Sequence, residues 1–334
     1  MIFGSFHAAF PMEDASRVGE ARRHAAELAA ACGLDEVQAG RLAIVVTELA
    51  TNLVRHAKNG RLLLSSRPAL GEVEVVAIDE GPGIPDIERS LRDGFSTGGT
   101  SGTGLGAVRR LSQSFDLHSS VPQGTVIVAR MRRDSRPAKA GGIYVGAVSL
   151  AAPGERVCGD GWGFAVDGDR AAVMLADGLG HGPDAAEAAD AALEAFAEHA
   201  MAGPREVVQH THTRLRATRG AAVMVLQADA NAGTVRSSGA GNVMARLLSG
   251  VSDRTILCQH GTAGVTIRSP DEATTAWPAH AMLVVFSDGI ESRWKAEALV
   301  PVLGRDPTLA AAVLARDHCR GRDDATVAVL RRKD

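Results

Sequence analysis

Cysteine is scarce in this sequence, and its four copies lie far from one another. They stand at positions 32, 158, 258 and 319, so no CxxC pair occurs. This spacing excludes a zinc site or a redox motif built on neighbouring thiols. Isolated thiols of this kind are typical of proteins in a reducing compartment.

The sequence also lacks a long apolar run and a strong net charge. No stretch approaches the roughly 18 apolar residues of a membrane-spanning helix, and the opening residues show no basic segment followed by an apolar one. We therefore expect a cytoplasmic protein without a membrane partner. The net charge of −3 gives no general electrostatic reason to bind nucleic acid.

The length of 334 residues, of which 45% are hydrophobic and 22% charged, is typical of a globular protein with two domains. A polar, basic segment with one proline and two glycines, RRDSRPAKAGG, separates two strand-like segments at 125–131 and 142–150. Such a composition is typical of a linker. We expect domains at 1–134 and 143–334, joined by a linker at 135–142.

Apolar periodicity predicts the helices of the first domain, and β-branched runs predict its strands. The expected helices span 13–31, 35–57 and 104–114, and the expected strands span 61–68, 72–80, 115–120 and 125–131. This order indicates an α+β sandwich with helices on one face of a mixed sheet. In the second domain, strands dominate both ends, and the expected helices lie near 184–202, 204–217 and 307–318, which indicates stacked sheets flanked by helices.

Polar residues interrupt the apolar helix expected at 35–57. Glu48, Asn52 and His56 stand at i, i+4 and i+8, which places them on one face of that helix. An exposed stripe on an amphipathic helix would explain them, and so would a buried, hydrogen-bonded network. A ligand site is the third explanation, and the next two motifs favour it.

Glycine-rich turns follow this helix in the sequence. A strand-like segment ends at Asp79, with Gly81 and Gly83 in a D-x-G-x-G turn, and the run GTSGTGLGA at 99–107 opens a helix. Glycine amides let phosphate oxygens approach closely, and a helix N-terminus adds partial positive charge. The spacing differs from the G-x-G-x-x-G of dinucleotide-binding folds.

In this order, the three motifs resemble the GHKL (Bergerat-type) ATP-binding family over residues 10–132, in the short form of the RsbT and RsbW group of serine kinases. The resemblance implies ATP and Mg²⁺ as ligands, Glu48 as the general base, Asn52 as a Mg²⁺ ligand and Asp79 as the acceptor of the adenine amino group. The run GTGLGAVRRLSQSFDLHS is closer to the RsbT type. The further ATP-binding residues that it implies are Gly81, Gly83, Gly102, Thr103, Gly104, Leu105 and Gly106.

Carboxylates recur at the expected strand ends of the second domain, each beside glycine, a small residue or another acid. Asp160 stands in CGDGW, Asp177 in LADGLGHG, Asp288 in SDG, and Asp323 with Asp324 in RDDAT. A turn or a cap explains any one of them alone. If they converge at one edge of a sheet sandwich, their hard oxygen atoms suit Mg²⁺ or Mn²⁺.

In order, these acidic motifs resemble the metal-dependent protein phosphatase (PPM) family, in its SpoIIE and RsbX branch, from about residue 143 to the end. The resemblance implies an α-β-β-α sandwich and two Mn²⁺ or Mg²⁺ ions, which generate a hydroxide that attacks a phosphoserine or phosphothreonine. The metal ligands that it implies are Asp160, Asp177, the carbonyl group of Gly178, Asp288 and Asp323. Asp324 ranks below Asp323, because many relatives have asparagine at that place.

Three histidines allow two explanations each. His181 lies in the glycine turn after Asp177, where a turn-stabilising role is favoured over a contact with substrate. His210 and His212 look like a metal pair, but residues two apart on a helix face different directions, which favours surface positions.

Both resemblances together predict a bifunctional regulator of bacterial signal transduction and stress response by partner switching. An ATP-dependent serine kinase and a metal-dependent phosphatase would act on STAS-domain antagonist proteins of the RsbS and RsbR kind, and a downstream switch protein is a further candidate partner. The alternative is a phosphatase whose N-terminal domain only binds nucleotide or sequesters a partner, as an anti-sigma factor does.

Overall fold

The computed structural model describes residues 2–92, 104–134, 142–267 and 269–333. The chain divides into two compact units, one made of residues 7–138 and the other of residues 1–6 together with residues 139–334. The sequence analysis assigned residues 1–6 to the first domain, whereas the structure joins them to the second unit. The reason is that strand β1 (Ile2–Phe3) pairs with strand β8 (Asp160–Asp167) in an antiparallel manner.

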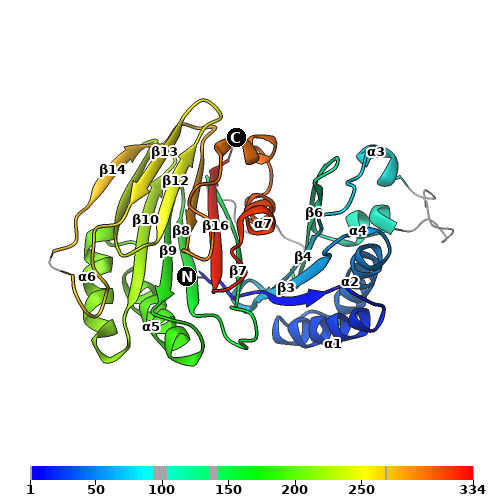
Figure 1. Cartoon of the computed structure of the whole chain (residues 1–334), viewed down its shortest axis with the longest axis horizontal. Coiled ribbons are helices and arrows are strands. Elements are labelled where there is room, and N and C mark those ends of the chain that lie inside the picture. The colour runs from blue at the N-terminus through cyan, green and yellow to red at the C-terminus, as the bar shows by residue number, and fades with distance from the viewer. Residues whose placement is uncertain (1, 93–103, 135–141, 268, 334) are drawn as a thin grey trace. The chain divides into compact units, whose positions relative to one another are not determined.

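The N-terminal unit contains one five-stranded sheet with helices on one face (Figure 1). The strand order is β2-β3-β4-β6-β5, and every pairing is antiparallel. The expectation of a mixed sheet was therefore wrong, because β5 and β6 form a hairpin that brings β6 back beside β4 in the opposite direction. The strands are β2 (Ala8–Pro11), β3 (Arg61–Arg67), β4 (Glu72–Ile78), β5 (Ser114–Ser120) and β6 (Gly124–Arg132).

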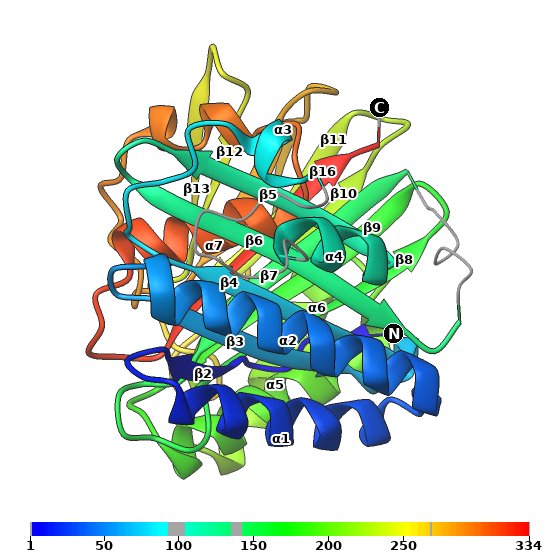
Figure 2. The same ribbon diagram turned by 90° about the vertical axis from the view of Figure 1, so that its right-hand side faces the viewer.

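Helices α1 and α2 cover one face of this sheet (Figure 2). Alternate strand residues such as Leu62, Leu64 and Val75 pack with Val45 and Leu49 of α2 in one apolar core. A capping box at Asp35 and Gln38 fixes the start of α2. The helices of the unit are α1 (Ser16–Ala31), α2 (Glu36–His56), α3 (Ile87–Ser90) and α4 (Gly104–Leu111), with a 3₁₀ turn η1 (Pro68–Leu70).

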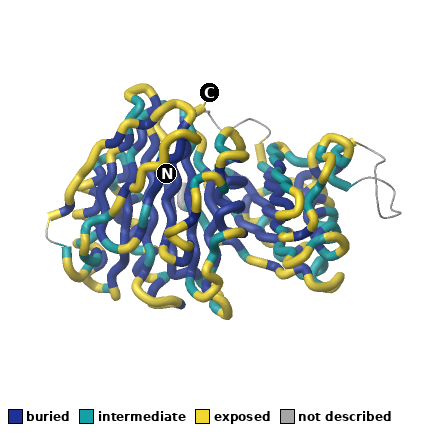
Figure 3. The backbone as a smooth tube through the Cα atoms, turned by 45° about the horizontal axis from the view of Figure 1, so that its top comes forward, coloured by how far each residue is buried: buried dark blue, intermediate teal, exposed yellow. Residues whose placement is uncertain are grey.

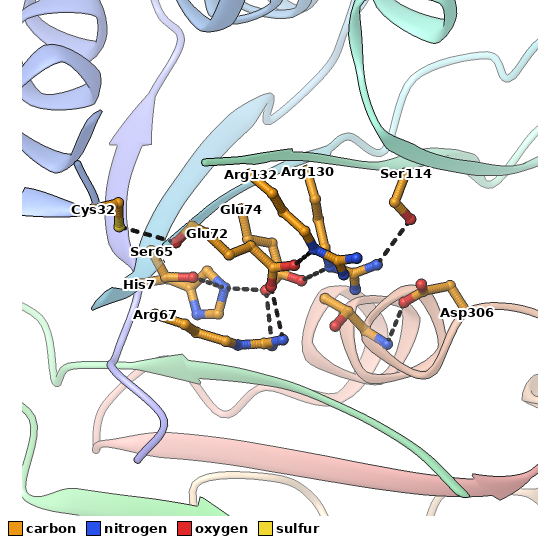
Figure 4. Close-up of polar contacts among 11 residues, drawn as sticks. His7, Cys32, Ser65, Arg67, Glu72, Glu74, Ser114, Arg130, Arg132 and Asp306 are labelled. Atoms are coloured by element: carbon orange, nitrogen blue, oxygen red, sulfur yellow. Dashed lines mark hydrogen bonds and ion pairs between the residues drawn. The ribbon is translucent and has the colours of Figure 1, made fainter. Parts of the chain in front are cut away.

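The other face of the sheet carries a buried network of charged side chains (Figure 4). Glu72 and Glu74 on β4 are fully buried. Arg67 Nη1 lies 3.1 Å from Glu72 Oε1, and Arg130 Nε lies 2.6 Å from Glu74 Oε2. Burial alone would raise the pKa of Glu74, but Arg130 and Arg67 hold it well below its ordinary value.

The C-terminal unit contains two antiparallel sheets that pack face to face. The six-stranded sheet has the order β1-β8-β9-β10-β11-β14, and the five-stranded sheet has the order β13-β12-β15-β16-β7. Their further strands are β7 (Ile143–Leu150), β9 (Arg170–Gly178), β10 (Ala221–Asp229), β11 (Thr234–Ala240), β12 (Met244–Leu248), β13 (Asp253–Leu257), β14 (Ala273–Ala276), β15 (Met282–Phe286) and β16 (Ala325–Arg332).

Helices cover the outer faces of both sheets and complete four layers. On β9, Val173 and Leu175 point into the core between the sheets, while Met174 points towards α5 and α6. Both faces of such a strand are buried, as the dark tube of the central strands shows (Figure 3). The helices are α5 (Pro183–His199) and α6 (Pro204–Arg214) on the first sheet and α7 (Pro307–His318) on the second, with 3₁₀ turns η2 (Leu215–Ala217), η3 (Ala296–Ala298) and η4 (Val300–Val302).

This α-β-β-α arrangement and the sandwich of the N-terminal unit confirm the predicted α+β fold class. Among the residues that the structure describes, none of the helices has the length and apolar character needed to span a bilayer.

Candidate functional site

The C-terminal unit brings two predicted metal ligands face to face. Asp160 opens β8 and lies directly opposite Asp177 near the end of β9 in the antiparallel register. Directly opposite residues of such a pair have Cβ atoms about 5 Å apart. Asp160 is buried, and its Oδ2 accepts a hydrogen bond from Ser287 Oγ at 2.6 Å. This bond ties the first sheet to the residue before Asp288.

The second sheet supplies the other acids. Asp288 follows β15, and its Oδ2 accepts from Asn242 Nδ2 at 2.7 Å. Asp324 precedes β16, is buried, and accepts from the amide of Ala152 at 2.9 Å through Oδ1. Asp323 accepts from the amide of Asp324 at 2.9 Å. The predicted ligands thus come from both sheets at the same end of the sandwich.

Glycines beside the acids provide the space for this approach. A Cβ on Gly159 would lie 2.6 Å from Asp324 Oδ2, and one on Gly289 would lie 1.9 Å from the carbonyl oxygen of Asp324. A Cβ on Gly178 would lie 2.1 Å from the carbonyl oxygen of Ala185 in α5. Each contact is too short for a real Cβ, so a side chain at any of these positions would displace Asp324 or helix α5.

The acids strongly perturb one another. Burial, aided by the charges of Asp324 and Asp288, raises the pKa of Asp160 to about 7. Burial also raises the pKa of Asp177 to about 9, and its acidic neighbours add to the rise, namely Asp160, Asp288, Asp323 and Asp324. The raised pKa values favour the protonated forms of both carboxyl groups, and a bound cation would displace these protons.

The donor set fits a divalent cation. Asp160 Oδ1 and Asp324 Oδ2 are buried and have no hydrogen-bond partner among the described residues. Unpaired buried carboxylate oxygens are costly, and hard cations such as Mg²⁺ and Mn²⁺ bind oxygens of this kind. Within the described ranges, however, no three acidic, histidine or cysteine side chains already close around one point. The unpaired oxygens of Asp160 and Asp324 are the observation that fits a cation at this end of the sheets.

The three predicted histidines each have contacts of their own. His181 Nδ1 lies 2.7 Å from Glu155 Oε1 on the exposed glycine turn. His212 Nδ1 accepts from the amide of Gly264 at 2.9 Å, and the ring of His210 stacks on that of His199 with centroids 4.0 Å apart. His210 and His212 thus have separate contacts, as their spacing predicted.

In the N-terminal unit, helix α2 carries the predicted polar stripe. Its apolar positions, such as Val45 and Leu49, are buried, whereas Glu48 and Asn52 are partly exposed and His56 is exposed. The stripe therefore lies at the edge of the core, where a ligand can reach it. This excludes the explanation by a buried polar network.

The D-x-G-x-G turn lies at the C-terminal end of α2. Asp79 Oδ1 accepts from the amide of Gly81 at 2.7 Å, and the amide of Glu80 donates to the carbonyl oxygen of Lys58 at 2.9 Å. A Cβ on Gly81 would lie 3.2 Å from the carbonyl oxygen of His56. The turn thus joins Asp79 to the end of the helix that carries Glu48, Asn52 and His56.

Helix α4 begins at Gly104 and packs against α2. A Cβ on Gly104 would meet no atom within 4 Å, so packing does not explain this glycine. An open backbone of this kind is what the expected phosphate site would require. Leu105 and Gly106 lie in the first turn of α4, while Gly102 and Thr103 lie outside the described residues.

Sequence reasoning missed the hydroxyl groups that support the acids. Ser287 Oγ donates to Asp160 and accepts from the amide of Thr326 at 2.9 Å, and Thr326 Oγ1 lies 2.8 Å from Ser149 Oγ. Both residues stand inside the SDG and DDAT motifs, so the signal was present. Asp324 was ranked below Asp323, but it is the more buried of the two.

Comparison with known families supports both assignments. The pattern of the histidine kinase-like ATPase domain family matches residues 10–131, and that of the stage II sporulation protein E (SpoIIE) family matches residues 167–333. The serine/threonine-protein kinase RsbT of Bacillus subtilis (strain 168) is 37% identical over 111 residues, which make up 33% of this chain and 84% of RsbT.

Three solved structures are similar to parts of this chain. A chain from a study of the bacterial stressosome has 27% identity and a TM-score of 0.54, and the match covers 57% of this chain and 99% of that one. RsbX in complex with magnesium has 18% identity and a TM-score of 0.53, with 59% and 99% covered. The SpoIIE phosphatase structure from Bacillus subtilis, of the PP2C type, has 15% identity and a TM-score of 0.50, with 78% of each chain covered.

These matches confirm the two resemblances on which the sequence analysis relied. The C-terminal unit has the fold of the PP2C-type phosphatase domains, and the N-terminal unit is homologous to a serine kinase over most of that kinase's length. The chain belongs to the SpoIIE family through its C-terminal unit, joined to an N-terminal histidine kinase-like ATPase domain of the RsbT kind.

Proposed function

We propose that the chain is a bifunctional partner-switching regulator, which phosphorylates serine residues with ATP and hydrolyses phosphoserine or phosphothreonine with divalent cations. The observation that carries the proposal is the pair Asp160 and Asp177, which face each other across two strands beside buried oxygens without partners. This arrangement suits cations that activate water, and it is supported by membership of the SpoIIE family.

At the proposed phosphatase site, Asp160, Asp177 and the carbonyl group of Gly178 would hold two Mn²⁺ or Mg²⁺ ions, with Asp288 and Asp323 on one of them. Such ions lower the pKa of a bound water and neutralise the phosphoryl oxygens. Ser287 and Thr326 position Asp160 through their hydroxyl groups. The carboxyl groups release their protons when a cation binds.

At the proposed kinase site, Asp79 would accept from the adenine amino group and Asn52 would bind Mg²⁺. Glu48, one helical turn before Asn52, would take the proton from the attacking serine hydroxyl. The glycine segment at 102–106 would close over the phosphates at the start of α4. Positioning and charge neutralisation are the main requirements of phosphoryl transfer, and these residues supply both.

We infer that the protein substrates are STAS-domain antagonist proteins of the RsbS and RsbR kind, with a downstream switch protein as a further partner. The likeness to RsbT and to a stressosome chain supports this inference. If both activities acted on the same phosphosite at once, ATP would be hydrolysed without net effect. The two activities therefore act on different sites or at different times.

The test incubates the full chain with γ-labelled ATP, Mn²⁺ and a candidate STAS-domain protein. Glu48→Ala is expected to abolish labelling of the partner, and Asp177→Ala to increase it by blocking removal of the label. Glu20→Ala on α1 and Asp167→Ala at the exposed end of β8 are the matched controls. If neither Glu48→Ala nor Asp177→Ala changes partner phosphorylation, the proposed function is wrong.

A second candidate function keeps the phosphatase and makes the N-terminal unit a nucleotide sensor or a partner-binding module. The presence of both Glu48 and Asn52, which are partly exposed, favours the kinase instead. The labelling experiment separates the two, because a binding module leaves the partner unlabelled in the Asp177→Ala variant as well.

A further inference from the structure

Arg219 is held firmly beside the glycine turn that follows Asp177. Thr218 Oγ1 donates to the carbonyl oxygen of Leu215 at 2.8 Å and accepts from the amide of Gly220 at 3.1 Å. The carbonyl oxygen of Gly220 accepts from the amide of Leu179 at 3.1 Å. The backbone is therefore fixed on both sides of Arg219, to the 3₁₀ turn η2 and to the glycine turn.

The side chain of Arg219 extends over that turn. A Cβ added to Gly180 would lie 3.5 Å from Arg219 Nη1, so the guanidinium group lies directly beside the turn. Asp184, in the first turn of α5, forms an ion pair with it. The Arg219 side chain is 53% exposed, and a carboxylate uses at most two of its five N–H donors.

The position of Arg219 relative to the acids follows from the strand register. Ala222 on β10 lies opposite Asp177, and Ala221 lies opposite Gly178, so Arg219 stands two residues before the paired segment. Arg219 therefore lies at the same end of the sheet as the acids that would hold the cations. Its guanidinium group adds positive charge at this end, and the planar arrangement of its N–H donors matches two oxygens of a phosphate dianion.

We propose that Arg219 binds the phosphoryl group of the substrate at the phosphatase site, with Asp184 holding the guanidinium group in place. The inference rests on the proposed phosphatase function and adds the residue that recognises the phosphate. Arg219 touches the substrate but takes no part in proton transfer, so its loss weakens binding more than it slows the chemical step.

A surface ion pair without functional role is the simpler explanation of the contact with Asp184, and the chain offers a matched control. Arg214 pairs with Glu198 between α6 and α5, with side chains 40% and 58% exposed, close to the 53% and 59% of Arg219 and Asp184. The two pairs have the same chemistry and similar exposure. Only Arg219 lies beside the glycine turn.

The test uses the full chain with Mn²⁺ and two readouts. Calorimetry measures the Kd of inorganic phosphate, and hydrolysis of p-nitrophenyl phosphate gives KM and kcat. We expect Arg219→Gln to raise both the phosphate Kd and KM by about 10- to 100-fold, the range of a lost charge-assisted pair of hydrogen bonds, with a much smaller change in kcat. Arg219→Lys, which keeps the charge but loses the fork, should fall between, and Arg214→Gln should match the wild type.

An unchanged phosphate Kd in Arg219→Gln would overturn the inference, as would an equal loss in Arg214→Gln. If Arg219→Gln fails to fold, the phosphate Kd and KM of Arg219→Lys test the inference instead, and unchanged values would overturn it. If the wild-type chain binds phosphate through Arg219 but hydrolyses no phosphomonoester, the proposed function fails while the assignment of Arg219 stands. A wild-type chain that binds no phosphate rules out the assignment itself.

Discussion

Gly178 separates Asp177 from helix α5, and the space it leaves is smaller than a methyl group. A Cβ at this position would come within 2.1 Å of the carbonyl oxygen of Ala185, which belongs to the helix backbone and cannot turn away. A Cβ on Gly289 would likewise meet a backbone atom, the carbonyl oxygen of Asp324, whereas one on Gly159 would meet the side-chain Oδ2 of Asp324. The glycine beside each acid is therefore a packing requirement as well as a means for a ligand to approach the backbone.

The change Gly178→Ala should test this requirement. The added methyl group forces α5 and β9 apart, and overpacking of this kind costs about 1–3 kcal/mol of the free energy of unfolding. We expect a lower Tm in thermal unfolding and weaker p-nitrophenyl phosphate hydrolysis. Gly304→Ala is the control, because a Cβ there meets nothing within 4 Å. Equal melting of Gly178→Ala and the wild type would contradict the packing argument.

The raised pKa of Asp177 gives a second prediction at this scale. Its pKa rises from 3.8 to about 9, so the folded state holds a proton that the unfolded state releases, and this contribution to stability is lost as pH rises through that window. In the presence of a chelator at pH 8, Asp177→Asn should therefore melt at a higher temperature than the wild type. With Mn²⁺ the order should reverse, because only the wild type gains from the cation.

Differential scanning fluorimetry at pH 5 and pH 8, with chelator and with Mn²⁺, measures all four combinations. Asp167→Asn, at the exposed end of β8, is the control and should follow the wild type throughout. A wild type that gains no stability from Mn²⁺ would argue against cation binding by these acids.

Individual site residues could be predicted only where a motif marks them. Asp160, Asp177, Asp288 and Asp323 stand beside glycine or another acid in a recognisable order, and all lie at the same end of the sheets. Arg219 could not be predicted, because its relation to Gly180 depends on how the loop before β10 folds.

At the scale of elements, helix α2 could be predicted closely because it has a strong period. Its apolar side chains recur at helical spacing, and Asp35 with Gln38 marks its start. The sheet was less predictable. A strand has the same alternation of apolar residues whether a hairpin or a crossover connects it to its neighbour. The sequence therefore did not reveal that the N-terminal sheet is antiparallel throughout. Strands β13 and β14 could not be predicted from the sequence, because they are short and mostly exposed.

The charged face of the N-terminal sheet gives a prediction that concerns β4. Arg130 and Arg67 hold the pKa of Glu74 well below 4.5 against the effect of burial, so Glu74 stabilises the fold above its unfolded pKa and loses this effect as pH falls through the folded value. Glu74→Gln removes the buried carboxylate that Arg130 and Arg67 face, and this loss should cost about 3 kcal/mol at pH 7. The cost should shrink towards pH 3.

Chemical denaturation at pH 7 and at pH 3 to 4 measures this difference. Glu20→Gln is the control, because Glu20 forms an exposed pair with Arg17 on α1, and such pairs contribute about 0–1 kcal/mol. A loss in Glu74→Gln that stays constant across this pH range would show that the charge of Glu74 is not what stabilises the sheet.

At the scale of the whole molecule, two separate segments of the chain form the C-terminal unit. The chain starts in the C-terminal unit, forms the N-terminal unit with residues 7–138, and then returns. The first segment is held to the C-terminal unit by the pairing of β1 with β8. The amide of Gly4 adds a hydrogen bond to the carbonyl oxygen of Trp162 at 3.0 Å. So short a strand carries no recognisable sequence pattern, so the boundary could not be predicted at residue 6.

The last prediction follows from this path. A Cβ on Gly4 would lie 1.8 Å from Trp162 Cε2, and Trp162 is two residues beyond Asp160 on β8, so Gly4→Val must displace β1 from the edge of the sheet. All three tryptophans of the chain, Trp162, Trp277 and Trp294, belong to the C-terminal unit. Tryptophan fluorescence therefore reports the unfolding of that unit alone.

We expect Gly4→Val to lower the tryptophan-detected Tm and to raise the Mn²⁺ concentration needed for stabilisation. The reason is that β8, which carries Asp160, loses its pairing with β1. Binding of a fluorescent ATP analogue should stay unchanged, since Asn52 and Asp79 belong to the other unit. Gly304→Val, at an open position, controls for the added side chain. If nucleotide binding falls while the tryptophan transition stays in place, residues 1–6 serve the N-terminal unit instead.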